Sequence, residues 1–255
     1  MTALFDDLSG NFAHNPEPLP AHLEALSSEV VRSKADLGVS VDPDVDRLAF
    51  VSEDGEMFGE EYTLVAVADY LLGITPGNTV SNLSSTRALR DVTKKHGGTY
   101  AASAVGEVNV VNKMKEVNAV IGGEGNGGII YPKTHYGRDA MVGVALFLTH
   151  LAKKECTASM LKASYPKYFM TKNKIALTPE IDTDNLLQKV AEQYANQEIN
   201  TIDGVKIDLE EGWIHLRKSN TEPIIRIYTE GNSETTAQNL SDKIKQDIGA
   251  ILKRQ

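Results

Sequence analysis

Three aspartates stand at alternate positions directly after an apolar segment. The run 35–41 predicts a buried strand, and Asp42, Asp44 and Asp46 follow it, with Arg47 next. In an extended backbone, residues two apart point to the same side, so the three carboxylates are expected to converge. Carboxylates held this close repel one another unless a cation neutralises them. Oxygen ligands suit Mg²⁺, which takes few protein carboxylates and completes its shell with water and substrate phosphate.

Two other interpretations compete for these aspartates. A calcium-binding EF-hand loop also has oxygen ligands at alternate positions, and Glu53 would supply its last ligand. That loop requires glycine at its sixth position, where this chain has Arg47, and helices at its flanks, where strands are expected here. The EF-hand interpretation therefore fails. A solvated acidic turn without a bound ion stays open for this segment alone.

A second polar segment lies near the C-terminus. Ser219, Asn220 and Thr221 occupy an expected turn and offer hydroxyl, amide and backbone N–H donors to an anion. Arg217 and Arg226 flank the turn, and guanidinium groups suit phosphate oxygens. Either arginine alone could be incidental in a polar turn. The whole string Arg-Lys-Ser-Asn-Thr-Glu-Pro-Ile-Ile-Arg is specific enough to predict a phosphate site.

A glycine-rich loop over residues 122–128 follows an apolar strand expected over 119–121. Its glycines let the backbone approach a ligand closely, and Glu124 and Asn126 can hydrogen-bond to hydroxyl groups. A flexible turn would have the same composition, so this loop alone indicates little.

In this order, the three segments resemble those of the α-D-phosphohexomutases, which move a phosphoryl group between the 1- and 6-positions of a hexose. The metal segment matches the family's loop position for position, except that Pro43 stands where glycine is common. The chain looks most similar to the phosphoglucosamine mutase and phosphomannomutase branches. The resemblance implies these roles: Asp42, Asp44 and Asp46 for Mg²⁺, Arg47 in the catalytic centre, Glu124 and Asn126 for sugar hydroxyls, and Arg217, Ser219, Asn220, Thr221 and Arg226 for phosphate.

The family's nucleophile, a phosphorylated serine followed by His-Asn-Pro, has no counterpart in this chain. His14, Asn15 and Pro16 are present, but Ala13 stands before them. The longer phrase over 12–20 instead resembles a later segment of the family's second domain. The resemblance therefore covers the C-terminal part of a mutase, and the phosphoserine would belong to an N-terminal domain outside this chain.

A further departure from the family concerns proton transfer. Many bacterial relatives carry a histidine where this chain has Gly128. The general acid/base is therefore unassigned, and His135 is a candidate only because it lies nearby in the sequence.

The resemblance implies a reaction in two halves. The phosphoserine of the absent domain would donate its phosphoryl group to a hexose 1- or 6-phosphate, with Mg²⁺ stabilising the transferring charge. The hexose 1,6-bisphosphate would then turn round in the site and return a phosphoryl group. The chain alone is expected to be inactive as a mutase but to bind metal and sugar phosphate weakly.

Two other classes of protein remain as alternatives. A haloacid-dehalogenase-like phosphatase would use Asp44 as nucleophile and Asp46 as acid, because Asp-x-Asp after a strand permits it. Arg47 and Leu48 depart from the usual Thr or Val, however, and the phosphate segment would have no role. A non-catalytic sugar-phosphate-binding protein would account for the short chain.

Composition restricts the class of protein further. The net charge of −9 argues against binding to nucleic acid or an anionic membrane. The single Cys156 excludes an intrachain disulfide and suits a reducing compartment. No apolar stretch approaches the roughly 18 residues of a membrane span, and residues 1–10 lack a signal-peptide pattern. A cytoplasmic protein without nucleic-acid or membrane partners is expected.

The order of the expected elements predicts an α/β fold. From residue 62 to residue 154 strands alternate with helices, which is typical of a parallel sheet covered on both faces. Residues 164–172 are expected to form a linker, and a small α+β domain follows. The expected domains are 1–58, the later part of the family's domain 2 with the metal loop; 59–165, an α/β domain with the sugar loop; and 166–255, an α+β domain with the phosphate loop.

Overall fold

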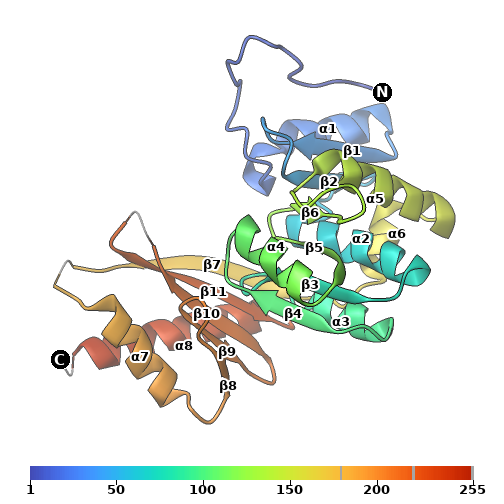
Figure 1. Cartoon of the computed structure of the whole chain (residues 1–255). Helices are drawn as coiled ribbons and strands as arrows, with labels where there is room; N and C mark the ends of the chain where they lie inside the picture. The colour runs from blue at the N-terminus through green and yellow to red at the C-terminus, as the bar shows by residue number, and fades with distance from the viewer. Residues whose placement is uncertain (179, 220–221, 254–255) are drawn as a thin grey trace. The chain divides into compact units, whose positions relative to one another are not determined.

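The computed structural model describes residues 1–178, 180–219 and 222–253. The chain divides into two compact units, Met1–Pro166 and Lys167–Gln255, which are described separately (Figure 1). The first unit contains a 3₁₀ helix (Pro20–His22), α1 (Glu24–Ser33), β1 (Leu37–Val41), β2 (Leu48–Ser52), α2 (Glu60–Ile74), β3 (Asn78–Asn82), α3 (Ala88–Lys95), β4 (Tyr100–Ser103), α4 (Glu107–Glu116), β5 (Ala119–Gly123), β6 (Ile129–Ile130), α5 (Ala140–Lys154) and α6 (Ala158–Ala163).

The central sheet of the first unit has the strand order β4-β3-β5-β6. β3 runs parallel to β4 and β5, whereas the short β6 is antiparallel to β5. A Cβ atom at Gly122 would meet Met114 of α4, and one at Gly123 would meet Leu64 of α2. Successive residues of a strand point to opposite faces, so α4 and α2 cover opposite faces of β5. The predicted parallel sheet with helices on both faces is confirmed.

β1 and β2 form a separate antiparallel pair, with Val41 opposite Leu48. Among the strands of the described residues, β1 pairs with β2 alone. β2 is buried along its whole length, and Phe50 stacks on Phe147 of α5 with ring centroids 4.0 Å apart. This aromatic contact fixes the hairpin against α5, and the turn that joins its strands carries the aspartates.

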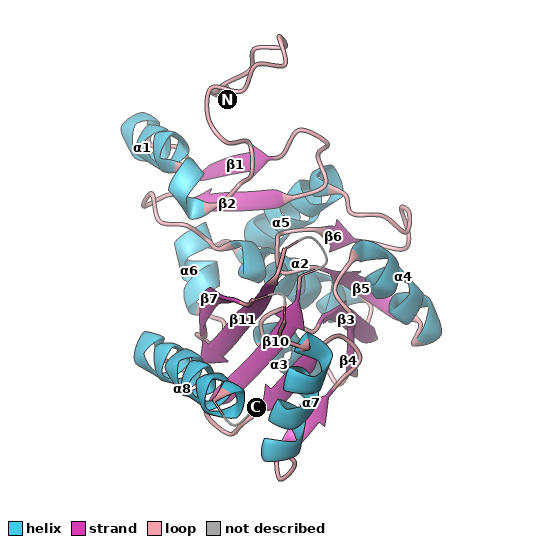
Figure 2. Cartoon of the chain, turned by 90° about the vertical axis from the view of Figure 1, so that its left-hand side faces the viewer, coloured by secondary structure: helices cyan, strands magenta, loops and turns pink. Residues whose placement is uncertain are grey.

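The second unit is an antiparallel sheet of order β7-β11-β10-β9-β8 with both helices packed against one face (Figure 2). Its core lies between sheet and helices and includes the fully buried Leu186, Ile227 and Ile244. The predicted α+β domain is confirmed. Its elements are β7 (Phe169–Ala176), α7 (Thr183–Gln193), β8 (Glu198–Asn200), β9 (Val205–Asp208), β10 (Gly212–Lys218), β11 (Ile224–Gly231) and α8 (Glu234–Leu252).

The predicted linker over residues 164–172 is wrong in its second half. Residues from Phe169 onward form β7, which pairs with β11 along its whole length. β7 is an edge strand with lysines at 172 and 174 and has no long apolar run, so its pattern resembles that of a connecting segment. The sequence also gives no sign of α6, β6 and β8, which have six, two and three residues.

No helix in the described parts of either unit combines the length and the apolar character needed to cross a lipid bilayer.

Candidate active site

The three aspartates lie in the turn between β1 and β2. One carboxylate oxygen from each of Asp42, Asp44 and Asp46 lies within 4.8 Å of the other two, so the group could hold a metal ion. Asp42 is buried, Asp46 is half-buried and Asp44 is exposed. The predicted convergence is present, but the extended backbone that was expected to produce it is not: residues 42–47 form a turn between the two strands.

Val45 gives this turn its shape. Its φ of 58° lies in the left-handed region, which is uncommon for a β-branched residue. Its N–H donates to the Asp42 carbonyl at 3.0 Å, and its own carbonyl accepts the N–H of Ala140 in α5 at 3.1 Å. The Asp42 carboxylate accepts the N–H groups of Asp46 and Arg47, at 3.0 and 2.9 Å. The loop therefore folds around the Asp42 carboxylate, and the hydrogen bond from Ala140 to Val45 connects it to the start of α5.

The crowding of carboxylates changes their pKa values. Burial and the neighbouring Asp42 and Asp44 raise the pKa of Asp46 to about 6, although Arg138 opposes the change. Burial acts in the same direction on Asp42, but the N–H groups of Arg47 and Asp46 hold its pKa below the ordinary value. A divalent cation on these oxygens would relieve the repulsion and keep Asp46 ionised at lower pH.

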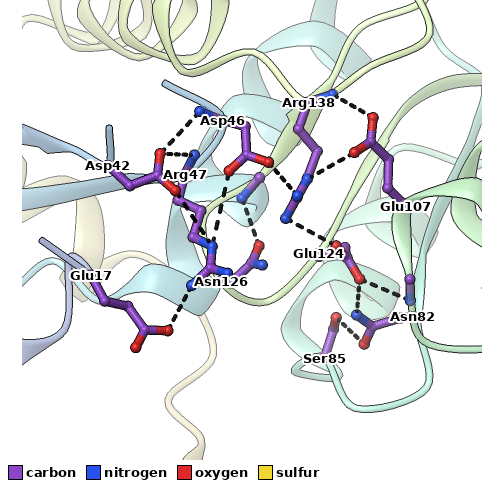
Figure 3. Close-up of polar contacts among 12 residues, drawn as sticks. Glu17, Asp42, Asp46, Arg47, Asn82, Ser85, Glu107, Glu124, Asn126 and Arg138 are labelled. Carbon is purple, nitrogen blue, oxygen red and sulfur yellow. Dashed lines mark hydrogen bonds and ion pairs between the residues drawn. The ribbon is translucent and has the colours of Figure 1, made fainter. Parts of the chain in front are cut away.

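Arg47, which the resemblance places in the catalytic centre, is the last residue of the turn over 42–47, called the metal loop below (Figure 3). Its Nε is 3.6 Å from Asp42 Oδ2 and 3.9 Å from Asp46 Oδ1. Its Nη1 donates to Glu17 at 2.6 Å, so the proline-rich segment 12–20 also touches the site.

The glycine-rich loop joins β5 to β6. Glu124 is buried, and its Oε1 accepts hydrogen bonds from Asn82 Nδ2 at 2.9 Å and from the Gly106 N–H at 3.1 Å. Asn126 uses its Oδ1 within the loop, where it accepts the N–H of Gly128 at 3.1 Å. The two side chains predicted to bind sugar thus lie in one loop, and the hydrogen bond of Asn126 stabilises the loop itself.

Arg138 connects the metal loop with the glycine-rich loop (Figure 3). Its guanidinium contacts Asp46, Glu124 at 3.3 Å and Glu107 at 3.2 Å. The sequence shows Arg138 only as part of the His-Tyr-Gly-Arg-Asp string. Asn82 and Glu107 were missed as well, although each stands where a strand ends or a helix begins, at the edge where parallel strands place their ligands.

Gly127 brings the glycine-rich loop against the start of β2. Its φ is 84°, and a Cβ atom there would lie 2.0 Å from the Leu48 carbonyl oxygen. We expect Gly127→Ala to lower the free energy of unfolding by about 2 kcal/mol, because the left-handed backbone and the close approach both exclude a side chain. Urea denaturation of the chain would measure the loss.

Gly10→Ala is the matched control for this prediction. Gly10 also has a positive φ, 79°, but a Cβ atom there would meet nothing within 4 Å. The control should cost about 1 kcal/mol or less. Equal losses in the two variants would contradict the role given to the close approach.

The phosphate segment belongs to the second unit, where Arg217 and Arg226 lie directly opposite each other on β10 and β11. Lys174 of β7 is in register with Arg226. Directly opposed residues share a face of the sheet, so three basic residues form a row, and like charges in such positions are destabilising. Arg217 also lies 3.5 Å from Asp203. An anion bound over this row would relieve the repulsion.

Ser219 follows β10, and its N–H donates to the Ile224 carbonyl at 3.0 Å. This backbone donor, which was expected to face an anion, therefore closes the hairpin instead. Asn220 and Thr221 lie outside the described residues. Lys174 was missed because the pattern gives no sign of the strand that carries it.

The structure has the phosphohexomutase fold. A phosphoglucomutase/phosphomannomutase family protein of Burkholderia thailandensis superposes with a TM-score of 0.84 at 26% identity, covering 97% of this chain and 54% of that one. An Aspergillus fumigatus N-acetylphosphoglucosamine mutase, solved in complex with GlcNAc-6P and magnesium, gives 0.61 at 14% identity and covers 84% and 51%.

Models of the phosphoglucomutase/phosphomannomutase family match the chain in three parts: domain II over residues 2–55, domain III over 59–168 and the C-terminal domain over 171–246. The chain belongs to this family, as the sequence resemblance predicted.

Curated relatives agree with this assignment. A phosphoglucomutase/phosphomannomutase of Thermococcus kodakarensis is 36% identical over 90% of this chain and 51% of its own length. A probable phosphoglucosamine mutase of Methanopyrus kandleri is 33% identical over 92% and 52%. The chain therefore spans about half the length of the curated relatives it matches.

Proposed function

We propose that this chain forms the metal-, sugar- and phosphate-binding part of a phosphohexomutase that interconverts hexose or hexosamine 6-phosphate and 1-phosphate. The observation that supports the proposal is that Asp42, Asp44 and Asp46 converge closely enough to hold a metal ion, while Arg138 contacts both Asp46 and the buried Glu124. The names of the relatives support the reaction class, and two of those most similar favour a hexosamine phosphate.

Each group has a distinct role in this proposal. Glu124 would accept hydrogen bonds from sugar hydroxyls, and Arg217 and Arg226 would bind the phosphate through their guanidinium groups. The aspartates fit Mg²⁺, which supplies positive charge for phosphoryl transfer when it is bound. The magnesium in the complex of the Aspergillus fumigatus enzyme supports the choice of metal.

The remaining part of the reaction would come from outside these residues. A phosphoserine in an N-terminal domain would act as phosphoryl donor and acceptor, and a hexose 1,6-bisphosphate would be the intermediate and activator. Arg47 would stand beside the transferring phosphoryl group, where a guanidinium stabilises developing negative charge.

We expect the 255-residue chain to bind glucosamine 6-phosphate weakly and to show no turnover in the presence of Mg²⁺ and a hexose 1,6-bisphosphate. Arg217→Ala should remove detectable binding in titration calorimetry, since a charged hydrogen-bond donor is worth about tenfold in affinity and the starting affinity is low.

The control for this variant is Arg32→Ala, which removes an exposed arginine paired with Glu29 on α1. It should leave binding unchanged. Unchanged affinity in Arg217→Ala would refute the phosphate site, and turnover by the purified chain would refute the inactivity.

A further inference from the structure

Arg138 meets carboxylates from three separate elements. Its Nε lies 3.2 Å from Glu107 at the start of α4, its Nη1 lies 3.3 Å from Glu124 after β5, and its Nη2 pairs with Asp46 of the metal loop. Each nitrogen faces a different carboxylate. Because the guanidinium is planar and rigid, it fixes the three groups relative to one another.

The two oxygens of Asp46 face opposite neighbours. Oδ1 lies 3.9 Å from Arg47 Nε, which is also 3.6 Å from Asp42 Oδ2, so this oxygen is on the side of the other aspartates. Oδ2 pairs with Arg138. Arg138 thus holds the outer oxygen and leaves the inner one for a metal ion, as expected of an outer-shell partner that orients a ligand.

Glu124 is held by the same side chain. Asn82 and the Gly106 N–H occupy its Oε1, whereas Arg138 contacts its Oε2. Loss of the guanidinium would therefore change the orientation of two carboxylates at once, Asp46 of the metal loop and Glu124 of the glycine-rich loop.

Gly128 provides the room for this arrangement. A Cβ atom at Gly128 would lie 2.4 Å from Arg138 Cδ and 3.1 Å from its Cγ. These are inner atoms of the side chain, so they cannot move aside without displacing the guanidinium. A side chain at position 128 and the present position of Arg138 exclude each other.

We propose that Arg138 is a positioning residue that sets Asp46 and Glu124 together, in space left free by Gly128, so that metal binding and sugar binding depend on one side chain. This proposal rests on the proposed function, since it gives Asp46 and Glu124 the roles assigned there.

Mn²⁺ binding to the full chain, followed by the electron paramagnetic resonance signal of the free ion, tests the proposal, because Mn²⁺ takes the same oxygen ligands as Mg²⁺. Arg138→Gln should weaken Mn²⁺ binding about tenfold, the scale for an outer-shell partner. Gly128→Ala should weaken it in the same direction by displacing Arg138. The double variant should bind as Arg138→Gln does, within about twofold, because the glycine acts only through the arginine.

Gly73→Ala is the control, since its Cβ atom would make only an ordinary contact with His96 at 3.8 Å. It should bind Mn²⁺ like the unmodified chain. Glucosamine 6-phosphate binding should weaken in Arg138→Gln and Gly128→Ala as Mn²⁺ binding does. Circular dichroism shows whether each variant is folded, and Gly128→Ala tests the position of Arg138 while the arginine itself is retained.

The outcomes separate this proposal from the proposed function. Unchanged Mn²⁺ affinity in Arg138→Gln, or losses that multiply in the double variant, would overturn the role of Arg138 while leaving the metal site intact. Absence of Mn²⁺ binding by the unmodified chain would overturn the metal site and this proposal with it.

Discussion

An Asp42→Asn variant is expected to bind Mn²⁺ on the order of 100-fold more weakly than the unmodified chain. Asp42 is 8% exposed, and its carboxylate both faces the other two aspartates and accepts the N–H groups of Asp46 and Arg47. The amide oxygen of asparagine can still accept those N–H groups, so the substitution removes the charge while keeping the loop. Titration of Mn²⁺ against the chain would measure the loss.

Two further variants separate the loss of the charge at position 42 from the loss of the hydrogen-bond acceptor and provide a control. Asp42→Ala removes the charge together with the acceptor and should also lower the free energy of unfolding, by about 1 kcal/mol for each lost hydrogen bond. Asp36→Asn, at an exposed position before β1, should change neither quantity. Mn²⁺ affinity within a few-fold of normal in Asp42→Asn would show that the metal binds elsewhere.

An Asp69→Ala variant is expected to lose about 3 kcal/mol of unfolding free energy. Asp69 of α2 is 5% exposed, and it accepts hydrogen bonds from His96 at 2.8 Å, Lys154 at 3.2 Å and the Tyr165 hydroxyl at 3.2 Å. These partners come from three other segments of the first unit. Removing the carboxylate leaves the buried Tyr165 hydroxyl without this acceptor and removes the hydrogen bonds that connect α2 with the three segments. Urea denaturation would measure the loss of unfolding free energy.

The stability difference caused by Asp69→Ala should depend on pH. Burial alone would raise the pKa of Asp69, but hydrogen bonds from His96 and Lys154 lower it to about 2 from an ordinary 3.8. A carboxyl with a lowered pKa contributes stability above its unfolded pKa and loses that contribution as the pH falls toward the folded value. The difference should therefore shrink by about 2 kcal/mol between pH 5 and pH 2. A difference that stays constant over this range would contradict the ion-pair explanation.

The sequence predicted the central α/β arrangement because elements such as α2 and α5 are largely apolar over 15 residues, a length that favours a helix over a strand. It failed for β7, where an edge strand has no continuous apolar run. The aspartates were expected to converge on an extended strand, whereas a left-handed Val45 brings them together in a turn. Local propensity favours an extended backbone for valine, so this conformation arises from the contacts of the loop with α5.

The contacts between the two loops of the site could not be predicted from the sequence either. Glycines and acidic residues identified the two loops separately, since each is continuous in the sequence. No spacing rule connects Asp46 with Arg138 or Glu124 with Asn82, because these pairs meet only when the strands are assembled. The resemblance predicted which loops would form a site, and the structure shows that Arg138 contacts a carboxylate of each.

Within the described residues, β1 pairs with β2 on one side and with no strand on its other side, which affects how the chain behaves in concentrated solution. A strand that pairs on one side only offers its remaining N–H and C=O groups to another copy. The net charge of −9 opposes such an approach, but this repulsion reaches only about 10 Å at 0.1 M salt and about 3 Å at 1 M. Concentrated salt shortens the range of the repulsion and leaves the edge unchanged, so we expect copies of the chain to associate more readily as the ionic strength rises.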